Sequence, residues 1–82
     1  MVLRLLFLGR LQDVAGEPER CVEAFPGTTL AALIERLEPA LVEAVRSPRV
    51  RMAINGTLIP EPAAAGLAEG DEIAFLPPVS GG

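Results

Sequence analysis

Residues 26–37 read PGTTLAALIERL, and this stretch decides the fold class. Pro26 and Gly27 predict a turn, and the hydroxyl of Thr28 or Thr29 can cap the start of a helix. The apolar residues that follow recur at positions i, i+3, i+4 and i+7, which share one helix face: Leu30, Leu33, Ile34 and Leu37. The stretch therefore predicts the main amphipathic helix of the chain.

The segments before this helix follow the two-residue period of β-strands. Residues 2–8 are apolar at six of seven positions, which is typical of an interior strand covered on most of both faces. Residues 19–25 (ERCVEAF) alternate and predict a strand that returns beside the first. We expect Cys21 in this strand to be a structural thiol, and the QDVAGEPE segment before it to form a loop.

The segments directly after the main helix predict a second helix and a hairpin. Residues 39–46 (PALVEAVR) resemble a short helix with proline in its first turn. Residues 50–54 alternate, and Asn55-Gly56 follows at once, with TLI behind it. Because Asn-Gly between apolar runs favours a tight reversal, we expect a strand, a turn and a short strand.

The remaining chain predicts a loop, a turn and one last strand. The PEPAAAG segment, residues 60–66, is expected to be a loop. We interpret Asp71 as part of an EGDE turn rather than as a contact for a partner. The last strand then runs over residues 73–76 and ends because Pro77 and Pro78 cannot continue a sheet.

These elements predict a fold of the α+β class. The 82 residues suffice for one hydrophobic core, and only 4% of them are aromatic, so we expect an aliphatic core around Phe7, Phe25 and Phe75. Two strand pairs and one main helix favour a mixed sheet packed on that helix, with the final strand beside the first. This arrangement is the β-grasp, or ubiquitin-like, fold. We expect the β-grasp domain to span residues 1–76 and an extended tail to span residues 77–82.

The composition argues against several classes of function. A net charge of −4 and scattered arginines are unsuited to nucleic-acid binding. No stretch is long enough to span a membrane, and the apolar run at the N-terminus is too short for a signal peptide, so we expect a cytoplasmic protein. With no histidine and one cysteine, the chain is not expected to hold a metal, a cofactor or a catalytic pair of its own.

Two features of the composition have more than one interpretation. The mean hydropathy of +0.40 is high for so small a domain, which indicates either apolar surface left for a partner or a sequence rich in alanine and leucine. The chain contains no lysine. A carrier of an activated carboxyl group would thereby avoid acylating itself, although a bias toward arginine explains the same absence.

The C-terminal segment FLPPVSGG suits a projecting tail. Pro77 and Pro78 fix φ and lack N–H groups, so this segment favours an extended path away from the sheet. Six residues reach at most about 20 Å, and Gly81 and Gly82 have no Cβ to clash inside a narrow cleft. A free carboxylate at Gly82 is therefore suited to activation inside the active site of another protein.

The sequence resembles the small subunit of molybdopterin synthase, a sulfur-carrier family of the MoaD/ThiS type. The resemblance is most specific in EGDEIAFLPPVSGG, residues 69–82, which has a Gly-Asp turn, an apolar strand, Pro-Pro and a terminal Gly-Gly. Weaker similarity lies in LLFLGRLQDVAG at 5–16, TTLAALIERL at 28–37 and AINGTLI at 53–59.

The resemblance implies a non-catalytic carrier subunit of a sulfurtransferase complex. Gly82 would be adenylated by an enzyme of the ubiquitin-activating type, which uses ATP, and then thiocarboxylated with sulfur from a desulfurase or a rhodanese-type donor. Gly81 and Gly82 would enter the large subunit of the synthase, where two sulfur transfers convert a cyclic pyranopterin phosphate into molybdopterin. The residues implied to line the partner contact are Phe75, Leu76, Pro77, Pro78 and Val79, although Phe75 can equally belong to the core.

Three alternatives to this function remain open. The same thiocarboxylate could serve thiamine synthesis or tRNA thiolation. A ubiquitin-like modifier would instead be joined covalently to target lysines. A β-grasp interaction domain with an incidental tail would lose nothing when Gly81 and Gly82 are removed.

Overall fold

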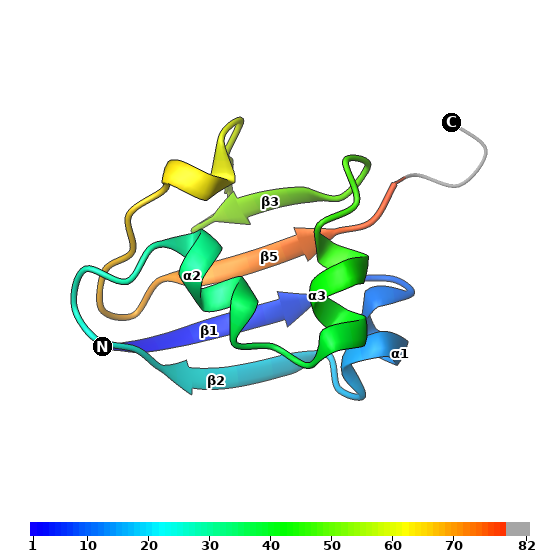
Figure 1. The fold of residues 1–82 in the computed structure, drawn as a ribbon, viewed down its shortest axis with the longest axis horizontal. Coiled ribbons are helices and arrows are strands. Elements are labelled where there is room, and N and C mark those ends of the chain that lie inside the picture. The colour runs from blue at the N-terminus through cyan, green and yellow to red at the C-terminus, as the bar shows by residue number, and fades with distance from the viewer. Residues whose placement is uncertain (79–82) are drawn as a thin grey trace.

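A computed structural model describes residues 1–78 of the chain, and Figure 1 shows how its elements are arranged. The strands and helices follow one another in the order β1 (Val2–Phe7), α1 (Leu11–Ala15), β2 (Glu19–Glu23), α2 (Leu30–Glu35), α3 (Pro39–Val45), β3 (Arg51–Ile54), β4 (Thr57–Leu58), a 3-10 helix (Pro62–Ala64) and β5 (Glu72–Leu76).

All strands form one five-stranded sheet in the order β2-β1-β5-β3-β4. The two neighbours β1 and β5 run parallel, and every other pair is antiparallel. The last strand thus adds beside the first, as the sequence predicts. The mixed sheet and the helix that packs on it confirm the α+β class and the β-grasp fold.

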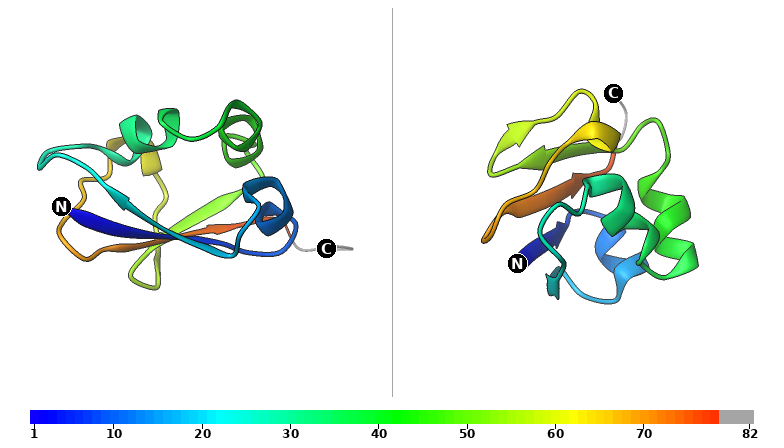
Figure 2. Two further views of the ribbon diagram at one scale, coloured as in Figure 1. Left: turned by 90° about the horizontal axis from the view of Figure 1, so that it is seen from below. Right: turned by 60° about the vertical axis from the view of Figure 1, so that its left-hand side comes forward.

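The helices lie on one side of the sheet and leave the other side open (Figure 2). On α2, the side chain of Thr29 accepts a hydrogen bond from the N–H of Ala32 at 3.2 Å, which confirms the predicted cap. On α3, Pro39 occupies the first turn as predicted. Asn55 and Gly56 both adopt positive φ, as the turn of a tight β3–β4 hairpin requires.

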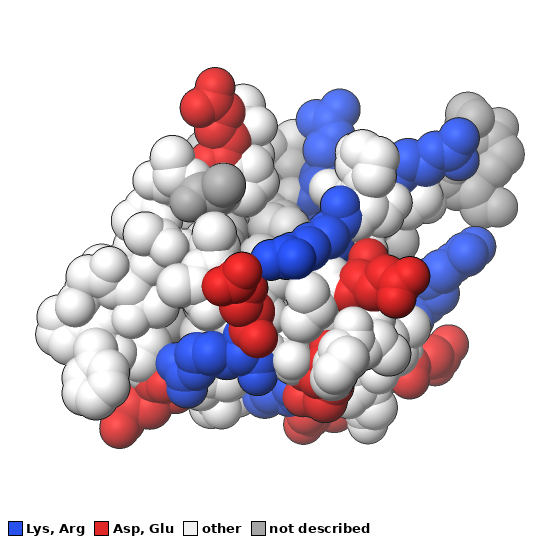
Figure 3. All heavy atoms as spheres, in the orientation of Figure 1, with Lys and Arg blue, Asp and Glu red and all other residues white. Residues whose placement is uncertain are grey.

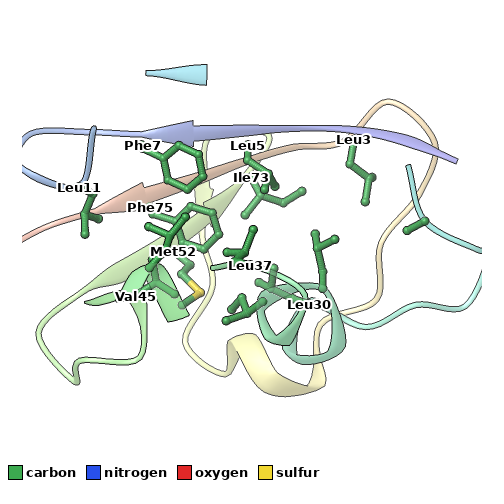
Figure 4. Close-up of a cluster of buried hydrophobic side chains, with 14 residues drawn as sticks. Leu3, Leu5, Phe7, Leu11, Leu30, Leu37, Val45, Met52, Ile73 and Phe75 are labelled. Atoms are coloured by element: carbon green, nitrogen blue, oxygen red, sulfur yellow. The ribbon is translucent and has the colours of Figure 1, made fainter. Parts of the chain in front are cut away.

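The core fills the layer between the sheet and the helices (Figure 4). Every predicted apolar residue of the main helix lies in this layer, which joins residues of all the larger elements: Leu3, Leu5, Phe7, Leu11, Ala24, Leu30, Leu33, Ile34, Leu37, Leu41, Val45, Met52, Ile73 and Phe75. At its centre the rings of Phe7 and Phe75 stack with their centroids 5.5 Å apart. No polar or charged residue of the described chain is buried, so hydrophobic burial dominates the stability of this domain.

Arg20 on β2 ties two segments to this core, the one between α1 and β2 and the one between α2 and α3. Its Nε donates to a carboxylate oxygen of Glu17 at 2.6 Å, and its Nη1 donates to Glu38 at 2.8 Å. A further nitrogen donates to the carbonyl oxygen of Ala15, and the guanidinium lies 5.5 Å from the ring centroid of Phe7. The hydrogen bond from Arg20 lowers the pKa of the Glu38 carboxyl group.

Two segments predicted as loops contain short helices. Residues 11–15 form α1, which shows no clear period because it is barely more than one turn long and buries only Leu11. Its one sequence signal is Gly16, which adopts the left-handed conformation at the helix end and donates its N–H to the carbonyl of Gln12. The predicted PEPAAAG loop likewise contains the 3-10 helix.

Three predictions about burial are wrong. Phe25 is 86% exposed rather than part of the core, because Ala24 occupies the inward phase of β2 and Phe25 falls in the outward phase. Cys21 shares that outward phase, so its thiol is exposed rather than structural. The first strand is interior to the sheet, but only one of its faces is covered, since Val2 and Leu8 are 45% and 41% exposed.

We predict that Arg20→Met destabilises the domain by about 1–3 kcal/mol, because it removes several charge-assisted hydrogen bonds from a largely buried guanidinium. The matched control Arg46→Met breaks only the exposed pair with Glu35 and should cost less than about 0.5 kcal/mol. Urea unfolding measures the free energy of unfolding of both variants.

The loss of stability caused by Arg20→Met should become smaller as the pH falls. The pKa of Glu38 is lower in the folded protein than in the unfolded chain, so its contribution is complete above the unfolded value and is lost as pH falls toward the folded value. The difference between wild type and Arg20→Met should therefore shrink below about pH 4.3. Equal costs for both substitutions, or a difference independent of pH, would contradict the role given to Arg20.

Candidate partner-binding face

The uncovered side of the sheet carries an apolar strip that runs across four strands. Leu6 on β1 lies beside Ala74 on β5, Ala74 lies opposite Ala53 on β3, and Ala53 lies opposite Leu58 on β4. Directly paired residues project from the same face of a sheet, so these side chains form one row, in which Ala53 is only 6% exposed. Leu58 at its end is 54% exposed.

A second apolar row lies next to the first, at the end of the sheet where β5 finishes. Leu76 ends β5 and is half-buried, and Leu8 follows β1 in the outward phase. The N–H of Leu8 donates to the carbonyl oxygen of Phe75 at 3.2 Å, which extends the parallel pairing past the end of β1. We call the two rows together, formed by Leu6, Leu8, Ala53, Leu58, Ala74 and Leu76, the apolar strip.

Charged residues border the apolar strip on the side away from this end. Arg4 donates to a carboxylate oxygen of Glu19 at 2.9 Å, and a second guanidinium nitrogen lies 3.4 Å from a carboxylate oxygen of Glu72. The hydrogen bond that Arg4 donates to Glu19 and the charge of both acids raise the pKa of Arg4. The border therefore resembles the polar rim that surrounds the apolar centre of a protein interface.

The turn before β5 is held by Asp71. Its two carboxylate oxygens accept hydrogen bonds from the side-chain amide of Asn55 and from the N–H of Ala68, both at 2.8 Å. The carbonyl oxygen of the Asn55 side chain accepts from the N–H of Glu72 at 3.0 Å. These bonds confirm that Asp71 serves its turn, and they fasten the β3–β4 hairpin to the start of β5.

The chain leaves the sheet through a narrow contact between Gly9 and Pro77. Gly9 has a φ of +55°, and a Cβ at this position would lie 2.9 Å from Cγ of Pro77. No glycine of the described chain other than Gly9 has a neighbour this close to a built Cβ. Glycine is therefore required here twice, for its backbone conformation and for the approach of the proline ring.

The structure places the predicted site residues in three groups. Leu76 and Pro77 are half-buried at the end of β5, and Pro78 is exposed, so all three remain available to a partner. Phe75 is 0% exposed in the core, so its predicted direct contact with a partner is wrong and the core interpretation holds. Val79, Gly81 and Gly82 lie outside the described residues.

Sequence reasoning missed Leu8 and Leu58 as surface residues. Leu8 belongs to an apolar run that we interpreted as covered on most of both faces, and the short strand that contains Leu58 carried no prediction of burial. The signal that could have found Leu8 is its phase, because Leu3, Leu5 and Phe7 already occupy the inward phase of β1.

Within residues 1–78 the structure shows no cluster of three or more histidine, cysteine or acidic side chains that could hold a metal. No helix in this part of the chain is long and apolar enough to cross a membrane.

The sequence pattern of the ThiS family matches residues 5–82, which include the strands of the apolar strip and the glycine tail. The chain belongs to the ThiS family. This confirms the resemblance to sulfur carriers of the MoaD/ThiS type.

Similar proteins support the assignment of this chain to the ThiS family. It is 33% identical to the molybdopterin synthase sulfur carrier subunit of Mycobacterium tuberculosis, over 98% of this chain and 96% of the relative. It is 28% identical to a chain in the complex of subunits 1 and 2 of the Helicobacter pylori molybdopterin-converting factor, over the full length of both, with a TM-score of 0.69. The fold is also that of SAMP1, a small archaeal modifier protein from Haloferax volcanii, with a TM-score of 0.84 at 24% identity over the full length of both chains.

We predict that Gly9→Ala destabilises the domain and displaces the start of the tail. Positive φ alone costs an alanine about 1–2 kcal/mol, and the clash with Pro77 adds to this. The control Gly27→Ala also has positive φ but meets nothing within 4 Å, so it measures the backbone cost alone.

Urea unfolding gives the two costs, and the amide resonances of Leu8 and Leu76 report on the end of the sheet. Equal losses of stability in Gly9→Ala and Gly27→Ala, or unchanged resonances in Gly9→Ala, would show that the contact between Gly9 and Pro77 does not fix the exit of the chain.

Proposed function

We propose that this ThiS-family chain is the sulfur carrier subunit of a molybdopterin synthase in the cytoplasm. Gly82 carries the sulfur as a C-terminal thiocarboxylate and delivers it to a cyclic pyranopterin phosphate. The observation that carries the proposal is the apolar strip. It reaches the point where the chain leaves the sheet, so a partner docked on the strip lies next to the tail.

The chemistry is divided between the tail and its partners. A carboxylate becomes an acyl donor when its oxygen is converted into a good leaving group. Here an adenylating enzyme of the ubiquitin-activating type joins the Gly82 carboxylate to the AMP part of ATP and releases pyrophosphate. A sulfur donor then displaces AMP, and the carbonyl carbon keeps the sulfur as a thiocarboxylate. In each of two transfers the sulfur bonds to the pterin, water supplies the oxygen that replaces it on the carbonyl carbon of Gly82, and the carrier returns as a carboxylate.

The large subunit of the synthase is the proposed partner on the apolar strip. The related Helicobacter pylori chain is described in a complex of two subunits of its molybdopterin-converting factor. On this chain we assign the contact to the exposed leucines of the strip together with Leu76, Pro77 and Pro78, because these residues surround the exit of the tail. The glycines at 81 and 82 then enter the active-site cleft, where a side chain would clash.

The first experiment is the intact mass of the protein after incubation with its adenylating enzyme, ATP and sulfide. We expect the mass to rise by the difference between one sulfur and one oxygen, and we expect the variant that lacks Gly81 and Gly82 to show no change. The truncation should leave urea stability unchanged, because no core residue lies beyond Phe75. Dithiolene formation by the truncated protein would contradict the proposal.

The same mass spectrum distinguishes a sulfur carrier from a protein modifier, and reconstitution distinguishes the sulfur acceptors. Thiamine synthesis and tRNA thiolation would use the same thiocarboxylate, and reconstitution with each acceptor distinguishes them from pterin. A modifier, the function that the name of the SAMP1 fold relative indicates, would instead form a stable adduct on a target lysine. An adduct without any thiocarboxylate would replace the sulfur-carrier proposal with the modifier.

The docking face is tested separately with Leu58→Glu. Losing one apolar contact and burying a charge should weaken the complex with the large subunit by roughly 10-fold to 100-fold in Kd. Stability should change by less than about 1 kcal/mol, because Leu58 is exposed on an edge strand.

The matched control is Phe25→Glu, which replaces an exposed apolar residue outside the strip. Titration calorimetry measures both variants. Equal affinity of wild type and Leu58→Glu for the large subunit, or equal losses of affinity in the two variants, would show that the apolar strip is not the docking face.

A further inference from the structure

The arginines of the described chain fall into two groups. Four of them donate to a carboxylate or a backbone carbonyl: Arg4, Arg20, Arg36 and Arg46. The other three are exposed and form no ion pair or side-chain hydrogen bond within residues 1–78: Arg10, Arg49 and Arg51. In a chain with 11 acidic residues and a net charge of −4, unpaired arginines need an explanation.

The topology brings these three arginines to one end of the molecule. Because β1 and β5 are parallel, their carboxyl ends meet, and Arg10 follows β1 directly after Gly9 and its contact with Pro77. Because β3 runs antiparallel to β5, its first residue Arg51 lies opposite Leu76, the last residue of β5. Arg10 and Arg51 therefore flank the exit of the chain from its two neighbouring strands.

Arg49 joins the group from the turn before β3. In this turn the N–H of Val50 donates to the carbonyl oxygen of Ser47 at 3.0 Å, which presents Arg49 on the surface two residues before Arg51. Figure 3 shows several basic side chains, with acidic ones nearby, on the side of the molecule where β5 ends in Figure 1. We call Arg10, Arg49 and Arg51 the arginine collar.

No acidic side chain within residues 1–78 forms an ion pair with the arginine collar. Asp13, the nearest acid along the chain to Arg10, forms no ion pair in residues 1–78. The acids that do form ion pairs bond to arginines elsewhere: Glu17, Glu19, Glu35, Glu38 and Glu72. The collar is thus a local positive region on a negatively charged domain, at the place that a partner must approach to reach the tail.

We propose that the arginine collar binds an acidic rim around the cleft of the adenylating enzyme that receives the tail. The inference rests on the proposed function, since it takes the tail as the part that enters the cleft. The collar adds a charged contact next to the apolar strip, and Arg51 shares the open face with Leu76. Such charges at the edge of an interface accelerate the encounter and orient it more than they add to affinity.

An acidic protein surface fits these residues better than a nucleic acid does. Three arginines neutralise few phosphates, and the collar has no aromatic residues for stacking on bases. The net charge of the domain would also repel a polyanion, whereas an acidic rim limited to the mouth of a cleft meets only the collar.

The test compares two double variants that change the net charge equally. Arg49→Glu/Arg51→Glu reverses the collar, and Arg36→Glu/Arg46→Glu reverses two arginines outside it. ATP–pyrophosphate exchange with the adenylating enzyme gives kcat/KM for each carrier at about 50 mM and about 300 mM salt, where screening differs strongly. Arg10→Glu tests the other side of the exit, and urea unfolding confirms that each variant is folded.

We expect kcat/KM to fall at least about 10-fold in the collar variant at low salt, with kcat unchanged, and much less in the control. In the wild type, kcat/KM should fall as salt rises. If net charge governed the encounter with an acidic enzyme, salt would instead raise kcat/KM, and both double variants would be impaired equally. Either result would contradict the proposal that the arginine collar binds the adenylating enzyme.

The two proposals fail in different ways. A wild-type carrier that is not adenylated at all would contradict the proposed function. Normal adenylation of the collar variant would contradict only the proposed role of the arginine collar. Binding of transfer RNA by the wild type that the collar variant loses would assign these arginines to RNA instead.

Discussion

The parallel pairing of β1 with β5 is the constraint on which the rest of this structure depends. It joins the first and last strands of the chain, and it sets Phe7 beside Phe75, whose rings stack at the centre of the core. A slip of β5 by one residue against β1 would move the ring of Phe75 to the open face and Leu76 into the core. The same register therefore fixes the core, the apolar strip and the direction in which the chain leaves the sheet.

Most of the fold follows from local patterns. The main helix, its threonine cap, the Asn-Gly hairpin and the last strand were all predictable, because each is specified by residues close together in the sequence. The helix α1 was not, since one turn of helix has too few residues to show a period. Its stability comes from packing Leu11 on the core, which is a tertiary effect.

The candidate site was predictable only in part. The Pro-Pro and Gly-Gly motif indicates a tail that other proteins use, and no tertiary information is needed to see it. Which residues form the docking face depends on which alternate side chains of each strand point toward the helices. A strand with apolar residues at both sets of alternate positions does not show which set points inward. Phe75 was assigned to a partner contact although it lies in the core, and Leu8 was expected to be covered although it lies on the surface, for that reason.

The proposed function separates the docking face from the reactive end, and this separation has a consequence for turnover. Contacts on the strip are the same whether Gly82 carries a carboxylate, an adenylate or sulfur, so their binding energy cannot favour the loaded carrier over the spent one. The spent carrier then competes with the loaded one for the same partner, as an inhibitory product does. Such a carrier turns over only if its complexes dissociate readily, and a docking face of few exposed leucines on a small domain would favour short lifetimes.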